Sequence, residues 1–417
     1  MAEDTLAQIR EARERIKHVV HTTPLLTNKS LDHAATEAYQ QASSSSSKPI
    51  PVRLHLAFKC EHLQKGGAFK ARGATNAVLY HLEQAKTEDA NLDPKKVWFV
   101  THSSGNHAGA LARAAQVAGA SAAVVMPLTT PAPKQAAVRG YGARAVMCDS
   151  NLQARESTAQ RVMEDLRAEV GSNGKVIFVH PYDEPLVIAG QGTLGELVDQ
   201  GRQLVLQGWG SGVETGLSYP DDLAQINGHQ PQNGASLPEA DSEPCFDLVL
   251  TPCGGGGQLS GLSTAIKGAD PRIRCYGVEP EEADDAARSV STGVLQPPVN
   301  PPTSIADGLL TALSPRTFAH IQKNVSGILT TSEEWIMRAL RLTWERTKQM
   351  VEPSACVGYA AILQAKPEWL QLVDDVVKHK LEAQPSLQAV DVRVGVVWTG
   401  GNVELPKMVA ALEKIPK

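Results

Sequence analysis

A lysine and a run of glycines are the two features of this sequence that could carry chemistry together. Lys70 follows two glycines, an alanine and Phe69 in the segment KCEHLQKGGAFKARGA, residues 59–74. A lysine among small and aromatic residues can lose its hydration, which lowers the pKa of the amine and frees it for Schiff-base chemistry. Most lysines are solvated surface charges, so this segment alone leaves a surface role for Lys70 open.

The glycine run, Gly254, Gly255, Gly256 and Gly257, follows an apolar strand-like segment and precedes a helical one. Without side chains, successive backbone N–H groups can converge on one anion, so the run predicts a phosphate cradle. The run lacks the Lys and Ser/Thr of a P-loop and the spacing of G-x-G-x-x-G, which disfavours an NTPase or a dinucleotide enzyme. A flexible glycine hinge is the alternative.

The elements that must position these residues alternate short apolar runs with Ala-rich stretches of helical length. The strand-like runs are WFVT, AAVVMP, ARAVMC, KVIFVH, FDLVLTPC, IRCYGVEP and RVGVVWTGG. This alternation predicts an α/β protein with open, mostly parallel, twisted sheets. Three of these runs, which lead into SSGNH, the glycine run and TGGN, end in small or polar residues before a helix. Ligands bind at the carboxyl ends of such strands, so the three turns indicate one shared site.

Two segments have the composition of flexible surface insertions. The first, at about 40–50, contains five consecutive serines, and the second, at about 201–245, is rich in Gly, Gln, Ser and Pro. Such segments cannot bury enough apolar area to offset chain entropy. The first twenty residues, in contrast, have apolar side chains at near-helical spacing and predict an amphipathic surface helix.

Composition narrows the class of protein. The 417 residues suffice for two domains, and 40 Lys and Arg against 45 Asp and Glu disfavour nucleic acid as a partner. The six cysteines never fall in a Cys-x-x-Cys pair, which argues against a zinc site or a disulfide framework and favours reduced thiols in the cytoplasm. No uncharged apolar run approaches the roughly 18 residues of a membrane span, so we expect no membrane insertion.

Five motifs in one order carry a resemblance to a known family: residues 59–74, SSGNH at 103–107, the tetraglycine at 254–257, VEP at 278–280 and TGGN at 399–402. Together they resemble the fold-type II pyridoxal-phosphate enzymes, specifically the serine racemase and serine/threonine dehydratase family. The resemblance runs from about residue 5 to about 410. It implies a homodimer of two-lobed α/β subunits, with a large cofactor-binding lobe of residues 1–95 and 185–417 and a small lobe of residues 96–184.

The resemblance assigns the cofactor, pyridoxal 5′-phosphate, to four positions. It implies that Lys70 holds the cofactor as a Schiff base and, once freed, acts as the base at Cα of the substrate. Asn106 would contact the 3′-oxygen of the cofactor, with an ordinary helix cap as the alternative. Gly254–Gly257 would hold the phosphate. Thr399 would face the pyridine nitrogen, and a hydroxyl there makes the ring a weaker electron sink, which favours elimination. An ordinary turn residue before Gly400 is the alternative for Thr399.

Substrate and proton-transfer positions follow from the same resemblance. Ser104 matches a serine that lies opposite the lysine in the family's racemases, so it favours racemisation, with a helix N-cap as the alternative. The residues that match contacts of the substrate carboxylate are Ser103, His107, Arg155 and Thr311, each with an ordinary surface or turn role as the alternative. Arg155 would suit bidentate carboxylate binding.

A divalent-cation site is implied by Glu279, Ala283 and Asp285 in VEPEEADD. Two carboxylates and a backbone carbonyl suit Mg²⁺, or else Ca²⁺ or Mn²⁺, and such an ion would act structurally or allosterically. The alternative is a solvated acidic face. Glu352 lies where the family has a glutamate near the cofactor ring, and its role stays open.

The sequence departs from the family at three positions. Ala68 replaces a common Ser, Cys356 replaces a usual Gly, and Tyr182 stands where racemases have Asn and many dehydratases an aromatic. Ser104 and Tyr182 therefore point to different outcomes for L-serine or a related β-hydroxy amino acid: racemisation, or β-elimination to a 2-oxo acid and ammonia. L-threonine and 3-hydroxyaspartate remain alternative substrates. A non-catalytic homologue that binds the cofactor is the alternative from another class.

Overall fold

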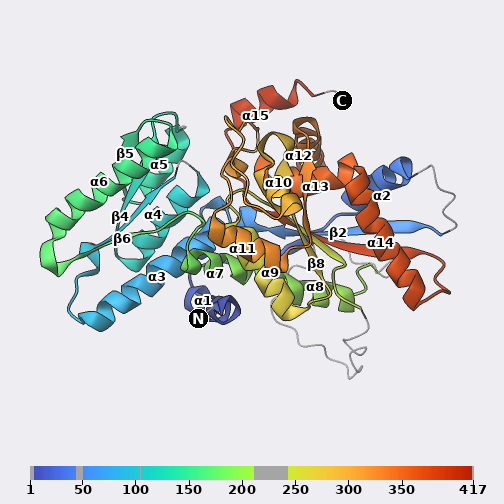
Figure 1. The fold of residues 1–417 in the computed structure, drawn as a ribbon, viewed down its shortest axis with the longest axis horizontal. Coiled ribbons are helices and arrows are strands. Elements are labelled where there is room, and N and C mark those ends of the chain that lie inside the picture. Colours follow the sequence, from blue (N-terminus) through green and yellow to red (C-terminus); the bar gives the residue numbers. More distant parts are fainter. Residues whose placement is uncertain (1–3, 44–49, 104, 131, 211–242, 416–417) are drawn as a thin grey trace.

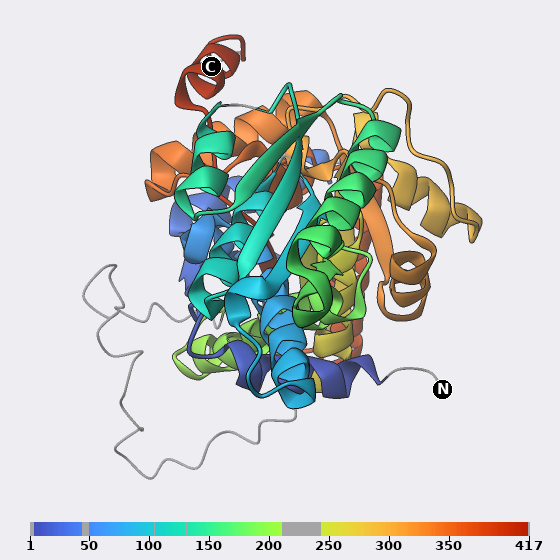
Figure 2. The same ribbon diagram turned by 90° about the vertical axis from the view of Figure 1, so that its left-hand side faces the viewer.

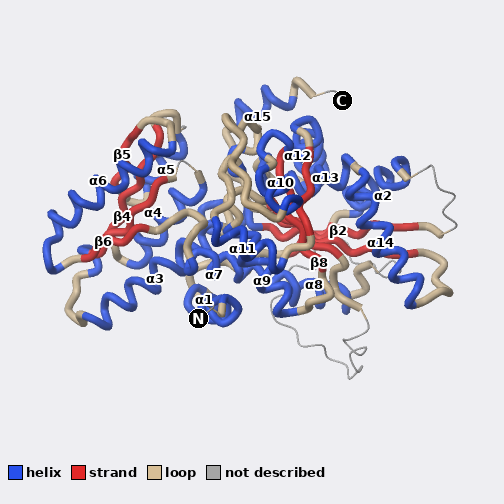
Figure 3. The backbone as a smooth tube through the Cα atoms, in the orientation of Figure 1, coloured by secondary structure: helices blue, strands red, loops and turns tan. Residues whose placement is uncertain are grey.

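In the computed structural model of the chain, residues 4–43, 50–103, 105–130, 132–210 and 243–415 are described. The strands form two separate sheets, seen on the left and the right of the molecule in Figures 1 and 3. The larger has six strands in the order β1-β2-β10-β7-β8-β9, and the smaller has four in the order β5-β4-β3-β6. The strands are β1 Leu25–Thr27, β2 Val52–Cys60, β3 Val97–His102, β4 Ser121–Pro127, β5 Arg144–Cys148, β6 Lys175–Phe178, β7 Leu248–Pro252, β8 Arg274–Pro280, β9 Gly327–Thr331 and β10 Val390–Trp398.

Helices cover both sheets. In chain order they are α1 Thr5–Ile16, α2 Lys29–Ala42, α3 Lys70–Glu88, α4 Asn106–Ala118, α5 Ala132–Gly140, α6 Leu152–Val170, α7 Pro185–Gly192, α8 Glu196–Leu206, α9 Gly257–Ala269, α10 Asp285–Thr292, α11 Pro315–Asn324, α12 Glu333–Thr347, α13 Pro353–Gln364, α14 Pro367–Ala383 and α15 Leu405–Leu412.

The larger sheet is built around the pair of β2 and β10. These strands run parallel in register over nine residue pairs, from Val52 beside Val390 to Cys60 beside Trp398. Only the three-residue β1 is antiparallel to its neighbour, and the other described pairings in both sheets are parallel. Because parallel strands end at the same edge, the chain segments that follow β2 and β10 emerge side by side.

The smaller sheet has apolar side chains on both faces. Val97 and Phe99 of β3 pack in a core with α3 and α4, whereas Val100 packs with α6 on the opposite face. This alternation is the period of two that a strand imposes on its side chains. Figure 2, which looks from the side of the smaller sheet, shows α6 lying along its strands.

Helix α3 links the two sheets. Its first residue, Lys70, follows the end of β2 at the edge of the larger sheet. Its later apolar residues, among them Ala74, Ala77, Val78 and Leu82, belong to the core of the smaller sheet. The lysine is therefore held by a helix that is anchored in the second core.

The seven predicted strands are confirmed as β3–β8 and β10, and the predicted first helix as α1. The insertion boundaries need correction, because α2 continues to Ala42, α8 continues to Leu206, and Cys245 is buried. Residues 44–49 and 211–242 of the two insertions lie outside the described residues. The six cysteines are all unpaired and buried. Within the described ranges no helix combines the length and the apolar character needed to cross a bilayer.

Helix α2 covers the exposed edge of β2 beyond the short β1. The N–H of Leu54 donates to Oγ1 of Thr36 (3.0 Å), and the N–H of Leu56 donates to Oδ1 of Asp32 (2.9 Å). Side chains that accept these bonds satisfy an edge that would otherwise be open to another strand. This position is electrostatically unfavourable for a carboxylate, since burial raises the pKa of Asp32 to about 7.

We expect Asp32→Asn to stabilise the protein in a pH-dependent way. A carboxyl whose pKa is raised in the folded state costs stability as the pH rises from its unfolded value towards about 7. Asparagine keeps an acceptor for Leu56 and has no charge to bury. The gain in unfolding free energy should grow between pH 5 and pH 8 by on the order of 3 kcal/mol in urea titrations. Exposed Asp165→Asn is the control, and a gain independent of pH would contradict this account.

Candidate active site

Two turns meet at the carboxyl ends of β2 and β10, and one of them leads into Lys70. The N–H of Phe69 donates to the carbonyl oxygen of Thr399 (3.0 Å), and the N–H of Gly401 donates to that of Gly67 (2.9 Å). An antiparallel bridge lies between these two bonds. The paired turns therefore fix the start of α3 relative to Thr399, two positions that the sequence separates by more than 300 residues.

The amine of Lys70 lies inside the site. Its Nζ donates to the carbonyl oxygen of Pro181 (2.9 Å) and is 5.1 Å from the centre of the Phe69 ring. Although part of the side chain remains open to solvent, burial lowers the pKa of Lys70 to about 8. Lys70 is thus no ordinary surface charge, because an amine with this pKa is partly neutral, and so nucleophilic, near neutral pH.

The four glycines form the turn between β7 and α9. Gly256, at the N-cap of α9, has a φ of 80°, in the left-handed region that favours glycine. Within the described part of the chain no side chain caps this helix. The N–H of Gly255 donates to Oγ1 of Thr311 (3.0 Å), so Thr311 braces the glycine turn. Uncapped amides at the start of a helix suit an anion such as a phosphate.

Tyr182 connects the glycine turn with Lys70. A Cβ on Gly255 would lie 2.6 Å from atoms of the Tyr182 ring, and one on Gly257 would lie 2.8 Å from the Cβ of Tyr182. The preceding residue, Pro181, is the acceptor for Lys70. The glycine turn and the amine of Lys70 therefore both contact the segment Pro181–Tyr182.

Asn106 is the first residue of α4 and lies between two polar side chains. Its Nδ2 donates to Oε1 of Glu352 (2.9 Å), and its Oδ1 accepts from Nδ2 of Asn402 (2.9 Å). The cap position of α4 is Gly105, so the alternative that Asn106 is a helix cap is wrong. Glu352 is only 5% exposed, and burial raises the pKa of its carboxyl to about 7.

The predicted substrate positions have different surroundings. Oγ of Ser103 accepts from the N–H two residues further on (3.2 Å). His107 is buried, and burial, reinforced by the charge of Lys70, lowers the pKa of its imidazole well below the ordinary value. Nε of Arg155 is buried and has no hydrogen-bond partner among the described residues. Ser104 lies outside the described residues, so its role stays a prediction.

The carboxylates of the predicted cation site are buried, so the alternative of a solvated acidic face is wrong. Glu279 and Asp285 are 0% and 3% exposed. Burial and the nearby Asp285 raise the pKa of Glu279 well above its ordinary value, and burial raises that of Asp285 to about 6. Glu279 also accepts from the N–H groups of the second and third residues of α10 (3.1 and 2.8 Å).

A cation would offset the repulsion between these two carboxylates. Burial and both carboxylates raise the pKa of the Cys253 thiol, and Cys253 directly precedes the glycine turn. Among the described residues no three acidic, His or Cys side chains are grouped as metal ligands. A cation held here would therefore need further oxygen ligands, such as the carbonyl of Ala283 and water.

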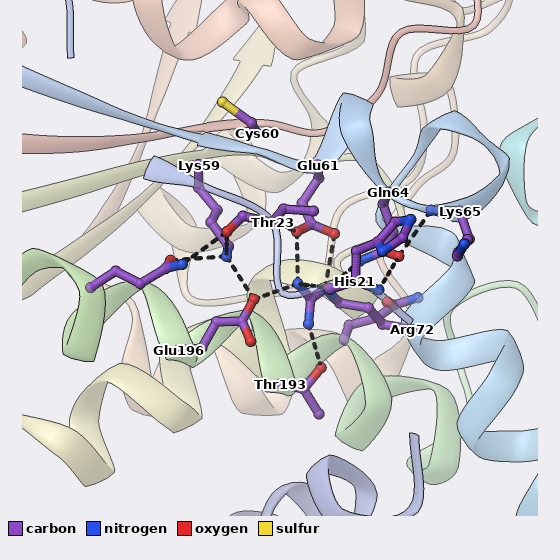
Figure 4. Close-up of polar contacts among 12 residues, drawn as sticks. His21, Thr23, Lys59, Cys60, Glu61, Gln64, Lys65, Arg72, Thr193 and Glu196 are labelled. Carbon is purple, nitrogen blue, oxygen red and sulfur yellow. Dashed lines mark hydrogen bonds and ion pairs between the residues drawn. The ribbon is translucent and has the colours of Figure 1, made fainter. Parts of the chain in front are cut away.

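A buried network of four charges lies beside the start of α3 (Figure 4). Arg72 donates through Nε and Nη2 to both carboxylate oxygens of Glu61 (2.9 and 2.8 Å) and through Nη2 to Glu196 (2.6 Å). Lys59 donates to the same oxygen of Glu196 (2.6 Å). Burial opposes ionisation of Glu61, but Arg72 holds the pKa of that carboxyl below its ordinary value. The network is electrically balanced and joins β2, α3 and α8.

Three contributors to the site escaped the sequence analysis. They are the carbonyl of Pro181, the side chain of Asn402 and the buried Arg72. Asn402 is part of the TGGN motif, which was the available signal, but its hydrogen bonds depend on how two distant turns pair. A backbone carbonyl has no side-chain signal at all.

Comparison with known proteins identifies the class. The family model described as pyridoxal-phosphate dependent enzyme matches residues 40–217 and 225–377. The chain belongs to this family, and the fold-type II architecture predicted from the sequence is confirmed.

Individual proteins and solved structures show which members of the family the chain is similar to. The chain is 33% identical to a serine racemase of Dictyostelium discoideum, covering 97% of each sequence. It is 34% identical to a β-hydroxyaspartate dehydratase of Paracoccus denitrificans, again covering 97% of each. The crystal structure of the serine racemase from Dictyostelium discoideum matches with a TM-score of 0.67, over 96% of this chain and 98% of that one. A crystal structure of a threonine deaminase matches with a TM-score of 0.66 and 35% identity, over the same shares of the two chains.

We expect Arg72→Met to lower the unfolding free energy by about 3–5 kcal/mol, because it leaves the buried Glu61 without its cation and Glu196 with Lys59 alone. Arg202→Met removes an exposed pair with Asp199 and should cost less than about 1 kcal/mol. Chemical denaturation of both variants measures the difference in unfolding free energy. Arg72→Lys keeps the charge but loses the bidentate contact with Glu61, so its unfolding free energy should lie between those of the two Met variants. Equal stability of the two Met variants would refute a supporting role for the network.

Proposed function

We propose that this protein converts L-serine or a related β-hydroxy amino acid with pyridoxal 5′-phosphate, by racemisation to the D-amino acid, by elimination to a 2-oxo acid and ammonia, or by both. The observation that carries the proposal is the meeting of Lys70 with the glycine turn across Pro181 and Tyr182. A reactive amine and an anion cradle on one space suit an aldehyde that bears a phosphate.

The residues present fit this cofactor. The backbone amides of Gly254–Gly257 would hold its phosphate, with Gly255 exchanging its bond to Thr311 for one to the phosphate. Lys70 would bind its aldehyde carbon, and Asn106 would contact its 3′-oxygen. Thr399, which is 4% exposed at the end of β10, would face the ring nitrogen. When bound, the cofactor supplies an electron sink that makes the α-proton of an amino acid acidic.

Lys70 would take the α-proton of the substrate, since a lysine with a pKa near 8 is partly unprotonated at neutral pH. Arg155, with an unpartnered buried Nε, would bind the substrate carboxylate, together with Ser103 and the start of α4 at His107. Return of a proton from the face of Ser104 would give the D-amino acid. Loss of the β-hydroxyl as water would instead release an enamine, which a second water hydrolyses through its imine tautomer to the 2-oxo acid and ammonia.

The choice between these products rests on the surroundings of the glycine turn. Tyr182 packs against Gly255 and Gly257. Racemases of the family have Asn at the position of Tyr182, so the tyrosine favours elimination. The similarity to a β-hydroxyaspartate dehydratase makes 3-hydroxyaspartate a second candidate substrate. A second carboxylate on the substrate would need a further cation, and His107, held neutral, does not supply one.

We also propose the organisation around this site. The small lobe of residues 96–184 would close over the substrate, with the ion pairs Lys134–Asp307 (2.9 Å) and Arg316–Asp183 (3.1 Å) joining it to the larger lobe. The chain would act as a homodimer in the cytoplasm, where its six buried thiols stay reduced. Mg²⁺, or Ca²⁺ or Mn²⁺ in its place, would bind at Glu279, Ala283 and Asp285.

The direct test is incubation with the cofactor and L-serine, followed by assays for pyruvate and D-serine. We expect at least one product, and a loss of more than about 100-fold in Lys70→Ala, which removes the base. Lys86→Ala, an exposed lysine on the same helix, is the matched control and should keep full activity. A yellow protein that forms neither product from serine, threonine or 3-hydroxyaspartate would instead support a non-catalytic homologue.

We expect removal of divalent cations to lower the melting temperature by about 5 °C, because the cation offsets two buried carboxylates. Excess Mg²⁺ after chelation should restore it. Asp285→Asn should abolish this response, whereas Asp165→Asn, at an exposed position of α6, should keep it. Identical melting curves with and without chelator would rule the cation site out.

A further inference from the structure

The side chain of Asn402 determines which way the amide of Asn106 faces. The oxygen and nitrogen of an amide are assigned from their hydrogen-bond partners. Nδ2 of Asn402 donates to the carbonyl oxygen of Gly66 (2.8 Å), which can only accept. The same Nδ2 carries a second hydrogen, and it donates this one to Oδ1 of Asn106 (2.9 Å). Asn402 thereby places the oxygen of the Asn106 amide.

Glu352 fixes the other end of the same amide. Its Oε1 accepts from Nδ2 of Asn106 (2.9 Å), and above pH 7, where the buried carboxyl is ionised, Glu352 has nothing to donate. Asn402 and Glu352 thus demand the same orientation from opposite ends. One hydrogen on Nδ2 of Asn106 is then left without an acceptor among the described residues.

The backbone leaves room for this arrangement at two glycines. A Cβ on Gly67 would lie 2.6 Å from Oδ1 of Asn402, and Gly67 also has a φ of 75°. A Cβ on Gly400 would lie 2.6 Å from Oε1 of Glu352. These glycines belong to the two paired turns that set Lys70 beside Thr399, so the amide clamp and the lysine share one scaffold.

We propose that Asn402 and Glu352 are positioning residues that lock the Asn106 amide with its free N–H towards the 3′-oxygen of the cofactor. This rests on the proposed function, in which Asn106 contacts that oxygen. A donor there stabilises the oxygen as an anion, so the shared proton stays on the nitrogen that links Lys70 to the cofactor. The clamp therefore sets the protonation form in which the cofactor meets its substrate.

The orientation can be reversed with a nearly isosteric substitution. In Asn402→Asp a carboxylate replaces the donor that faces Oδ1 of Asn106, and the amide must turn its Nδ2 towards position 402. Its oxygen would then face Glu352 and the cofactor. Asn402 is exposed, so the substitution leaves the packed core untouched.

The readout is the absorption spectrum of the reconstituted protein, in which the longer-wavelength band belongs to the form with an ionised 3′-oxygen. We expect wild type to show mainly this band and Asn402→Asp to shift towards the shorter-wavelength band. The dissociation constant of the cofactor should rise about tenfold, as for loss of one hydrogen bond to a charged oxygen. Asn402→Ala should lie between the two, because Glu352 still holds the amide.

Asn324→Asp is the matched control, since Asn324 donates to Thr264 on the far side of α9 and should leave the spectrum unchanged. Wild-type spectrum and affinity in a folded Asn402→Asp variant would overturn the inference, as would an equal shift in Asn402→Ala, because alanine cannot reverse the amide. A wild-type protein that takes up no cofactor would instead contradict the proposed function itself. The two failures are thus distinguishable.

Discussion

The parallel register of β2 with β10 is the constraint on which the rest of the site depends. It ends both strands at the same edge, so that the turn leading into Lys70 and the turn after Thr399 meet and exchange backbone hydrogen bonds. The amine is then placed by backbone geometry and not by its own long side chain. Because α3 runs on into the core of the smaller sheet, any shift of that sheet is transmitted to the helix that begins with the lysine.

The charged and polar groups around Lys70 fall into two sets, one with matched charges and one with unmatched polar groups. In the buried network beside the start of α3, the charges compensate one another and need no ligand; its members are Lys59, Arg72, Glu61 and Glu196. Around the site itself the polar groups are incompletely matched: an uncapped helix start, an unpartnered Arg155 nitrogen among the described residues, and a carboxyl at Glu352 whose pKa is raised. The uncapped helix start and Arg155 are where a phosphate and a carboxylate would be bound, since an unmatched polar group is costly to bury until a ligand satisfies it.

The sequence predicted the fold class and the residues of the candidate site better than it predicted the contacts between those residues. Apolar runs bounded by glycine or polar turns identified seven strands, but β2 was missed although VRLHLAFKC alternates, and β9 is only five residues long. The glycines and the turn that contains Asn106 were found because each follows a predicted strand, whereas Lys70 was found from its small and aromatic neighbours and from the family resemblance. The carbonyl of Pro181 and the hydrogen bonds of Asn402 were not, because pairing between turns far apart in the chain creates them.

The central claim is that Lys70 reaches the aldehyde of a cofactor whose phosphate lies on the glycine turn. Borohydride reduction of the protein with bound pyridoxal 5′-phosphate, followed by digestion and mass spectrometry, tests it most directly. The account predicts a phosphopyridoxyl mass on the peptide that contains Lys70 and on no other. A tag on a different lysine, with Lys70 unmodified, would contradict it.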